Sequence, residues 1–334
     1  MLALKIIPVE ADEAKRKAIL LELKALHEAS HPSIVSFYGA FYREGAVHVA
    51  LEYMDASLLD ISRGAGASLP EPVLAAIALP VLHGLVYMHR EKHIIHRDIK
   101  PSNLLVDSAG NVKIADFGVS GELHHTLAKC ASWVGTVHYM SPERIQGSSY
   151  SYDSDVWSLG ITMLELATAA FPYPPERNGR RLSFWDLLDA IVESPPPTPP
   201  NHFAPHFHSF IGACLQKEPS QRASSSQLLH HPLLAANGTT DIASWLLSAI
   251  AKLPPRGSEQ ELGETLGETL GETLGGTLVG GNGGGGFGGG GRGVVGDHDA
   301  AMLASIMGGG TVQQLGQTLP SHGGEGADAM MEDA

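Results

Sequence analysis

The residues from His96 to Gly118 include side chains whose types and spacing suit metal binding and proton transfer. Asp98 and Asn103 lie on a polar loop, and Asp116 follows a short hairpin. Carboxylate and amide oxygens are the ligands that Mg²⁺ prefers in proteins. Asn103 and Asp116 are therefore predicted metal ligands, and Asp98 is free to receive a proton.

The hairpin that positions these residues is predicted from two short apolar runs. Leu104–Val106 and Val112–Ile114 flank the turn-rich loop Asp107–Asn111, a pattern typical of two antiparallel strands. The hairpin brings the two acids and the amide to one end of a small sheet. An ordinary polar hairpin is the alternative interpretation, and the ordered spacing of the polar residues argues against it.

These motifs resemble the protein-kinase signature, in which H-R-D-x-x-x-x-N precedes D-F-G. His96-Arg97-Asp98, with Lys100 and Asn103, matches the first motif, and Asp116-Phe117-Gly118 matches the second. The resemblance implies an α+β, bilobal fold with a small β-rich lobe and a large helical lobe. It also implies ATP and Mg²⁺ as cofactors, Asp98 and Lys100 as catalytic residues, and Asn103 and Asp116 as metal ligands.

Composition restricts the class of protein. The chain of 334 residues has a formal charge of −14, which argues against nonspecific binding to nucleic acid or anionic lipid. Two cysteines are too few for a disulfide framework and favour a reducing compartment. The N-terminal segment is not a signal peptide, and no apolar run approaches the length of a membrane span. We expect a soluble protein with no nucleic-acid or membrane partner, located in the cytoplasm or also in the nucleus.

The first segment is predicted to form a strand and a helix that supply an ion pair. Leu2–Ile7 resembles the kinase V-A-I-K strand, with Lys5 in the phosphate-binding place, and apolar spacing predicts a helix over Glu13–Glu28. Glu22 is the expected partner of Lys5, and a solvated acid is the alternative. Strands are predicted over Ile34–Tyr42 and Ala46–Tyr53. By resemblance, Leu51 is the gatekeeper and Glu52 and Met54 belong to the segment that binds adenine.

The later part of the chain is predicted to be helical. Asp155, in a long buried helix that begins at Asp153, is expected to anchor the catalytic-loop backbone. A helix is predicted over Pro70–Arg90, and Pro80 is expected to kink or divide it. Further predictions are an irregular connection over 171–207 with the helix Phe184–Glu193, a capping box at Ser224–Gln227, and an amphipathic helix over Thr240–Leu253.

Residues 254–334 are predicted to be disordered because glycine and Leu-Gly-Glu-Thr repeats dominate them. Gly281–Gly286 matches G-x-G-x-x-G, but neither a strand before it nor a helix after it is predicted, so we assign it no nucleotide role. The expected domains are a partial small lobe over 1–54, a large lobe over 55–253 and the tail over 254–334.

The chain further resembles the mitogen-activated protein (MAP) kinase kinases, through Ile34–Tyr42, Asp116–Gly121, Val134–Arg144 and Phe171–Pro175. That family's members are dual-specificity kinases that phosphorylate the Thr and the Tyr of a MAP kinase activation loop. An upstream MAP kinase kinase kinase activates them by phosphorylating two hydroxyl residues.

The positions that match these two hydroxyl residues are Thr126 and Ser132, at a spacing similar to that of plant and green-algal members. Each phosphate would add negative charge and could order the loop against Arg97. Unmodified solvent-facing hydroxyls are the alternative. Cys130 lies between them and is interpreted as incidental, with a redox role as the alternative.

The resemblance fails at the N-terminus, because the family's first two strands and their glycine-rich loop have no counterpart before Lys5. One interpretation is a truncated gene model of an active kinase. The other is a catalytically impaired scaffold or decoy that binds cascade partners.

Overall fold

The computed structural model describes residues 1–9, 13–65, 68–116, 137–148, 151–173, 176–177, 180–181, 183–237 and 240–254. All of them lie in one compact unit, Met1–Gly293. The predicted disorder of the tail falls on residues that, apart from Pro254, lie outside the described part. The three predicted domain boundaries stay predictions.

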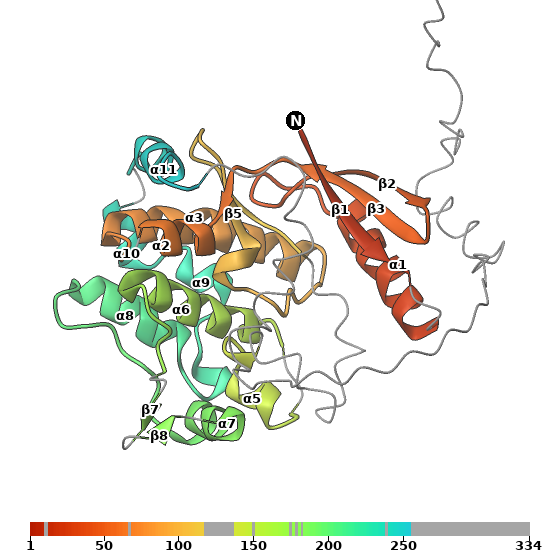
Figure 1. The fold of residues 1–334 in the computed structure, drawn as a ribbon. Coiled ribbons are helices and arrows are strands. Elements are labelled where there is room, and N and C mark those ends of the chain that lie inside the picture. The colour runs from red at the N-terminus through yellow and green to blue at the C-terminus, as the bar shows by residue number, and fades with distance from the viewer. Residues whose placement is uncertain are drawn as a thin grey trace, which may run out of the picture. The chain divides into compact units, whose positions relative to one another are not determined.

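An antiparallel sheet and one helix form the N-terminal part (Figure 1). Strands β1 (Leu2–Pro8), β2 (Phe37–Arg43) and β3 (Ala46–Glu52) are arranged in the order β1-β3-β2. Helix α1 (Glu13–Glu28) has the predicted bounds. Its Leu23 and the Val49 side chain of β3 are both buried. The alternating pattern predicted for the strands and the helical spacing predicted for α1 are therefore both confirmed here.

The predicted strand over Ile34–Tyr42 is too long at its start. Strand β2 begins at Phe37, and Ile34 instead forms an isolated parallel bridge with Ile114. The Val35 N–H donates to Ile114 O at 3.0 Å, and the Ile114 N–H donates to Ser33 O at 2.8 Å. The first residues of the apolar run therefore bond to the second sheet instead of extending β2.

The second sheet consists of the predicted hairpin and one further short strand. Strands β4 (Ala56–Ser57), β5 (Leu104–Val106) and β6 (Val112–Ile114) pair antiparallel in that order. The hairpin residues match the prediction.

Helices make up most of the remaining described residues. They are α2 (Leu58–Ala65), α3 (Glu71–Val86), η1 (Tyr87–Glu91), η2 (Pro101–Asn103), α5 (Pro142–Ile145), α6 (Asp153–Thr168), α7 (Phe184–Glu193), α8 (Pro205–Cys214), η5 (Pro219–Gln221), α9 (Ser225–Leu228), α10 (Pro232–Asn237) and α11 (Ala243–Ile250), with a small hairpin of β7 (Glu176–Arg177) and β8 (Arg180–Arg181).

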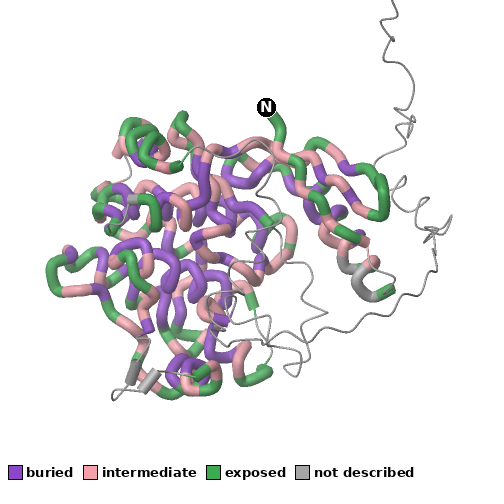
Figure 2. Tube along the Cα trace, viewed as in Figure 1, coloured by how far each residue is buried: buried purple, intermediate pink, exposed green. Residues whose placement is uncertain are grey.

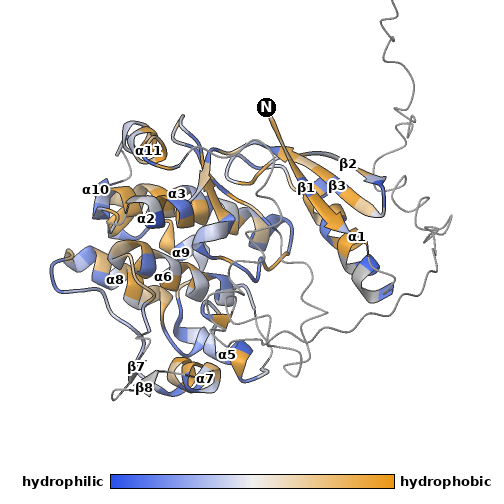
Figure 3. Ribbon diagram, in the orientation of Figure 1, coloured by the Kyte–Doolittle hydropathy of each residue, from blue (hydrophilic) through white to orange (hydrophobic). Residues whose placement is uncertain are grey.

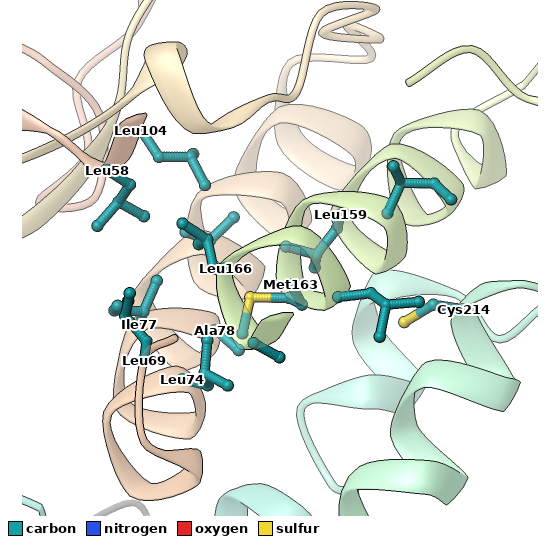
Figure 4. Close-up of a cluster of buried hydrophobic side chains, with 14 of the residues drawn as sticks. Leu58, Leu69, Leu74, Ile77, Ala78, Leu104, Leu159, Met163, Leu166 and Cys214 are labelled. Carbon is teal, nitrogen blue, oxygen red and sulfur yellow. The ribbon is translucent and has the colours of Figure 1, made fainter. Parts of the chain in front are cut away.

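The main core lies between α3, α6 and α8, where buried positions predominate (Figure 2). Figure 3 shows many hydrophobic residues along these helices. Figure 4 shows side chains of α3 and α6 in contact within the core. Gly160 of α6 allows α8 to approach, since a Cβ there would lie 2.7 Å from Cys214 Cβ. This packing fixes α6, which carries Asp155.

The predicted helix over Pro70–Arg90 forms, but Pro80 does not divide it. The α-helical pattern continues to Val86 and then changes to the π-helix η1. Within the described residues, Glu71–Glu91 is the one stretch long and apolar enough to cross a membrane by length and composition, and most of it is buried in the protein.

Three other predicted helical features are present. Helix α7 has the predicted bounds, and Ser224 and Gln227 form the expected capping box before α9. Helix α11 is shorter than the predicted Thr240–Leu253, because the Asp241 carboxylate accepts the Ala243 N–H at 2.9 Å at its start. Its Leu246 is buried in the main core, as expected for a helix that packs on the large lobe.

Candidate active site

The loop that carries Asp98 is held by Asp155 of α6. The Asp155 carboxylate accepts the backbone N–H groups of His96 and Arg97, both at 2.8 Å. Burial opposes ionisation of Asp155, but its hydrogen-bonding partners, His89 foremost, lower its pKa overall. The predicted anchoring role of Asp155 is confirmed.

His96 connects the same loop to the strand that leads to Asp116. Its Nε2 lies 3.0 Å from Ala115 O, which can only accept, so Nε2 carries the proton. Its Nδ1 then accepts the Asp98 N–H at 3.3 Å. Arg144 adds a further constraint, since it donates to Arg97 O at 2.8 Å. Arg97 itself has a positive φ of 72°, a conformation that these contacts stabilise.

Asp98 has one engaged and one open carboxylate oxygen. Oδ2 accepts from Lys100 Nζ at 2.9 Å and from Asn103 Nδ2 at 2.8 Å. Oδ1 is buried and has no hydrogen-bond partner in the described part of the chain. A buried acceptor without a donor is costly, so this oxygen is suited to a hydroxyl donor from a ligand.

Lys5 lies between two carboxylates, as a phosphate-binding amine would. Its Nζ is 3.3 Å from Glu22 Oε1 and 2.7 Å from Asp116 Oδ1. Burial alone would lower the pKa of Lys5, but the two carboxylates raise it well above its ordinary value. The predicted pair with Glu22 is present, and the contact with Asp116 was not predicted.

The two carboxylates respond differently to their surroundings. Burial raises the pKa of Glu22 despite the nearby amine of Lys5. The pKa of Asp116 is lowered, because the charge and hydrogen bond of Lys5 outweigh burial. Asp116 also has a positive φ of 57°, which Asp tolerates better than most residues. The lowered pKa favours the ionised form of Asp116, which suits it to a cation.

The described residues fit a magnesium ion that is shared with substrate phosphates. Asn103 Nδ2 donates to Asp98 O and Oδ2, so the Asn103 amide oxygen is the atom left for a cation, with only a 3.3 Å contact from Ser102 Oγ. The Asn103 backbone oxygen accepts the Ala115 N–H at 2.8 Å, so Asn103 is bonded to the residue that precedes Asp116. No cluster of three His, Cys, Asp or Glu side chains suited to a metal occurs among the described residues. Mg²⁺ in phosphoryl-transfer sites needs only one or two carboxylates besides phosphates and water.

The side chain of Glu52 has a structural role that the sequence did not reveal. Lys113 Nζ lies 2.6 and 2.8 Å from its two carboxylate oxygens, and the Ser36 N–H donates to it at 3.0 Å. Burial opposes ionisation, but these donors lower the pKa of Glu52. Met54 is buried in a small cluster that Leu51 contacts. Adenine binding by the backbone of Glu52 and Met54, and the gatekeeper role of Leu51, stay predictions.

Sequence reasoning also missed a buried ion pair below the catalytic loop. Arg222 donates to both carboxylate oxygens of Glu143, at 2.8 and 3.0 Å. Glu143 and Arg144 are adjacent in α5, so this pair helps to place the residue that binds Arg97 O. Glu143 and Arg144 are the last two residues of Val134–Arg144, a segment used for the family resemblance, and this was the available signal.

Several predicted residues lie outside the described part. Thr126, Ser132 and Cys130 fall there, as do Phe117 and Gly118. The predicted contact of Arg97 with a phosphate is therefore untested.

Comparisons with known proteins match this geometry to a family. Residues 1–234 match the family profile described as "Protein kinase domain". The chain is 47% identical over 258 residues to Mitogen-activated protein kinase kinase 1 of Arabidopsis thaliana, covering 76% of this chain and 73% of that protein. The chain belongs to the MAP kinase kinases.

Two other relatives show how far the match extends. Identity is 48% over 235 residues with Mitogen-activated protein kinase kinase 2 of Arabidopsis thaliana, covering 70% of this chain and 64% of that protein. Identity is 40% over 336 residues with Dual specificity mitogen-activated protein kinase kinase 1 of Dictyostelium discoideum, and this match covers 73% of this chain and 51% of that protein. The kinase chain thus spans about half to two thirds of the length of these two relatives. Membership in the protein kinases implies use of ATP and a divalent metal.

Proposed function

We propose that this kinase transfers the γ-phosphoryl group of ATP to hydroxyl groups in the activation loop of a MAP kinase. The open, buried Oδ1 of Asp98 is the observation that carries the proposal. A substrate hydroxyl is the donor that this oxygen lacks, and Lys100 Nζ contacts the other oxygen of the same carboxylate, Oδ2, at 2.9 Å.

The protein residues would act by positioning and charge rather than by covalent chemistry. Asp98 orients the substrate hydroxyl and accepts its proton late in the reaction. The Lys100 ammonium offsets negative charge on the transferred group. Lys5, oriented by Glu22, binds the α- and β-phosphates.

Asn103 and Asp116 would hold magnesium through an amide and a carboxylate oxygen. When bound, the metal supplies charge neutralisation to the phosphates. The contact of Lys5 with Asp116, at 2.7 Å, occupies one carboxylate oxygen, so we propose that Lys5 moves toward the phosphates when nucleotide binds.

We further propose dual specificity toward Thr and Tyr, and activation by an upstream kinase through Thr126 and Ser132. The printed name of the Dictyostelium relative includes dual specificity, which supports the first part. The second part rests on the sequence resemblance and on Arg97 lying next to Asp98. A cytoplasmic or nuclear location is proposed on composition alone.

The test is a phosphorylation assay with the full chain. Purified protein, pre-incubated with an active upstream kinase, is mixed with Mg-ATP and a MAP kinase that cannot phosphorylate itself. Phosphosites are mapped by mass spectrometry. Phosphate on the activation-loop Thr and Tyr is expected, and Asp98→Asn should abolish it. The exposed Asp189→Asn on α7 is the matched control.

A parallel thermal-shift titration separates a non-catalytic chain from an active one. A ligand that binds only the native state must raise the unfolding midpoint. No shift with Mg-ATP and no phosphate transfer would favour the scaffold interpretation. Transfer that persists in Asp98→Asn would remove Asp98 from its proposed role.

A further inference from the structure

The π-helix η1 places a histidine in the interior beneath the catalytic loop. At the end of α3, the Lys92 N–H donates to Tyr87 O at 3.2 Å, a wider turn than in an α-helix. Short π-helical turns are rare and frequently occur at functional sites. His89 lies within this turn and is only 4% exposed.

Both ring nitrogens of His89 have polar partners from distant parts of the chain. Nε2 lies 2.8 Å from Asp155 Oδ2 on α6, and Nδ1 lies 3.2 Å from Ser225 Oγ on α9. Asp155 and Ser225 are buried as well, at 0% and 3% exposure. The ring of Tyr152 packs on His89 with a centroid distance of 4.8 Å. Asp155 is the charged group that faces the imidazole from α6, and Ser225 is the polar group that faces it from α9.

The protonation pattern of this cluster follows from its donors and acceptors. An ionised carboxylate only accepts, so His89 Nε2 must carry a proton and donate to Asp155. In a neutral imidazole Nδ1 is then an acceptor, and the Ser225 hydroxyl can donate to it. The lowered pKa of Asp155 is consistent with an ionised carboxylate at this position.

Asp155 is also the residue that holds the catalytic loop. Its Oδ2 accepts from both His89 and the His96 N–H, and its Oδ1 accepts from the Arg97 N–H. A continuous series of hydrogen bonds therefore runs from Ser225 through His89 and Asp155 to the residue next to Asp98.

We propose that Ser225 is a positioning residue for phosphoryl transfer, because its hydroxyl bonds the second ring nitrogen of His89 and so holds the ring in the orientation that donates to Asp155. Without that hydroxyl, Nδ1 is left without this partner in the interior and the ring can rotate, so Asp155 loses a fixed donor. The effect on catalysis rests on the proposed function, whereas the effect on the loop backbone does not.

The test uses Ser225→Ala in the full chain, with Ser225→Cys as a variant of similar size and weaker donor strength. Ser226→Ala, one residue further on the same helix, is the matched control, because within the described residues its hydroxyl has no hydrogen-bond partner and His230 contacts its backbone oxygen. The capping residue Ser224 stays unchanged in all variants. Thermal midpoints establish that each variant folds.

Two readouts report on positioning without activity. Selective ¹⁵N labelling of histidine, with His89 assigned by His89→Gln, shows which ring nitrogen carries the proton. Hydrogen–deuterium exchange measures protection of the His96 and Arg97 amides. For Ser225→Ala we expect a broadened Nε2–H signal, because the ring is held less firmly, and exchange about tenfold faster at both amides. Ser225→Cys should lie between wild type and Ser225→Ala, and Ser226→Ala should match wild type.

A kinetic readout joins the inference to catalysis. We expect kcat to fall about threefold to tenfold in Ser225→Ala with the KM for ATP unchanged, since the loop rather than the nucleotide contacts is affected. Wild-type exchange and a sharp, wild-type Nε2–H signal in Ser225→Ala would overturn the proposal. Altered exchange in a chain whose wild type transfers no phosphate would support positioning and refute the proposed function.

Discussion

The catalytic loop and the Lys5 cluster are two charged regions of the same site, and they are built differently. Around the loop, Asp155 is fully buried and its carboxylate accepts from two backbone N–H groups and His89. Around Lys5, the side chains of Lys5, Glu22 and Asp116 are 30%, 18% and 48% exposed, and the Lys5 amine forms ion pairs with both carboxylates. Buried, fully satisfied hydrogen bonds fix a geometry, whereas partly solvated ion pairs can exchange partners at low cost.

The difference matches the two tasks proposed for these regions. A proton acceptor must keep its position relative to a hydroxyl, so its backbone is held from several sides. A phosphate-binding amine must release a carboxylate when phosphates arrive, and an exposed pair permits this exchange.

The largest expected effect is on the loop anchor. Asp155→Ala removes the acceptor of three hydrogen bonds and takes this partner from His89 Nε2 and from two backbone N–H groups in the interior. We expect a loss of about 3–5 kcal/mol in the free energy of unfolding, as for other broken buried pairs. Urea unfolding followed by circular dichroism measures it, with Asp189→Asn as the control. A loss below about 1 kcal/mol would contradict the distinction between the two regions.

A smaller effect on stability but a large one on ligand binding is expected at Lys5. Lys5→Met removes an amine that is partly exposed, so the free energy of unfolding should change by only about 0–1 kcal/mol. The rise in melting temperature caused by Mg-ATP should disappear, because the phosphates lose their cation. Thermal shift with and without Mg-ATP measures both values. Retention of the full shift would show that Lys5 does not contact the phosphates.

Acid titration compares how much one carboxylate in each region contributes to the free energy of unfolding. The pKa values of Asp155 and Asp116 are lowered in the folded protein. Each therefore contributes stability that is present above the unfolded pKa, near 3.9, and is lost as pH falls through the folded value. We expect the decline of stability below about pH 4 to be shallower in Asp116→Asn than in wild type.

Glu22 provides the opposite sign within the same titration. The raised pKa of Glu22 means that the folded protein binds this proton more tightly than the unfolded chain does. The protonated Glu22 side chain therefore contributes stability below the unfolded pKa, and this stability is lost as pH rises from the unfolded pKa through the folded pKa. Glu22→Gln should remove this decline. Urea midpoints measured across the acid range decide both signs, and parallel curves for all variants would refute them.

The smallest effect is expected for an exposed pair on α1. Lys24 Nζ lies 3.9 Å from Glu28 Oε1, and both side chains are more than half exposed. Lys24→Ala should change the free energy of unfolding by less than about 0.5 kcal/mol, and 0.5 M salt should abolish any difference. This variant gives the baseline for a solvated ion pair.

The parts of the site that the sequence predicted are those encoded by local spacing. The positions of Asp98, Asn103 and Asp116 around a hairpin follow from two short apolar runs and a turn-rich polar loop. The bounds of α1 and α7 follow from helical periodicity, and in α7 from the Ser183 capping box. The pairing of Lys5 with Glu22 was predicted by family resemblance, since the two lie on neighbouring elements.

The parts that the sequence could not predict depend on contacts between distant residues. His89 and Ser225 are 136 positions apart, and no local pattern relates them. Pro80 is tolerated inside α3 although its local rule predicts a break, because the helix is buried in the core. Ile34 left the predicted strand for a tertiary partner, Ile114. In each case packing outweighed the local preference.

The short segment Ser33–Ser36 has a mechanical consequence. Along this segment the Val35 N–H reaches Ile114 O, while Ser36 O accepts the Glu52 N–H. One stretch of four residues thus bonds to the end of β3 and to the end of β6, two residues before Asp116. A tilt of the N-terminal sheet would therefore displace the backbone next to Asp116 through this stretch, so the orientation of that sheet and the position of the proposed metal ligand would be coupled.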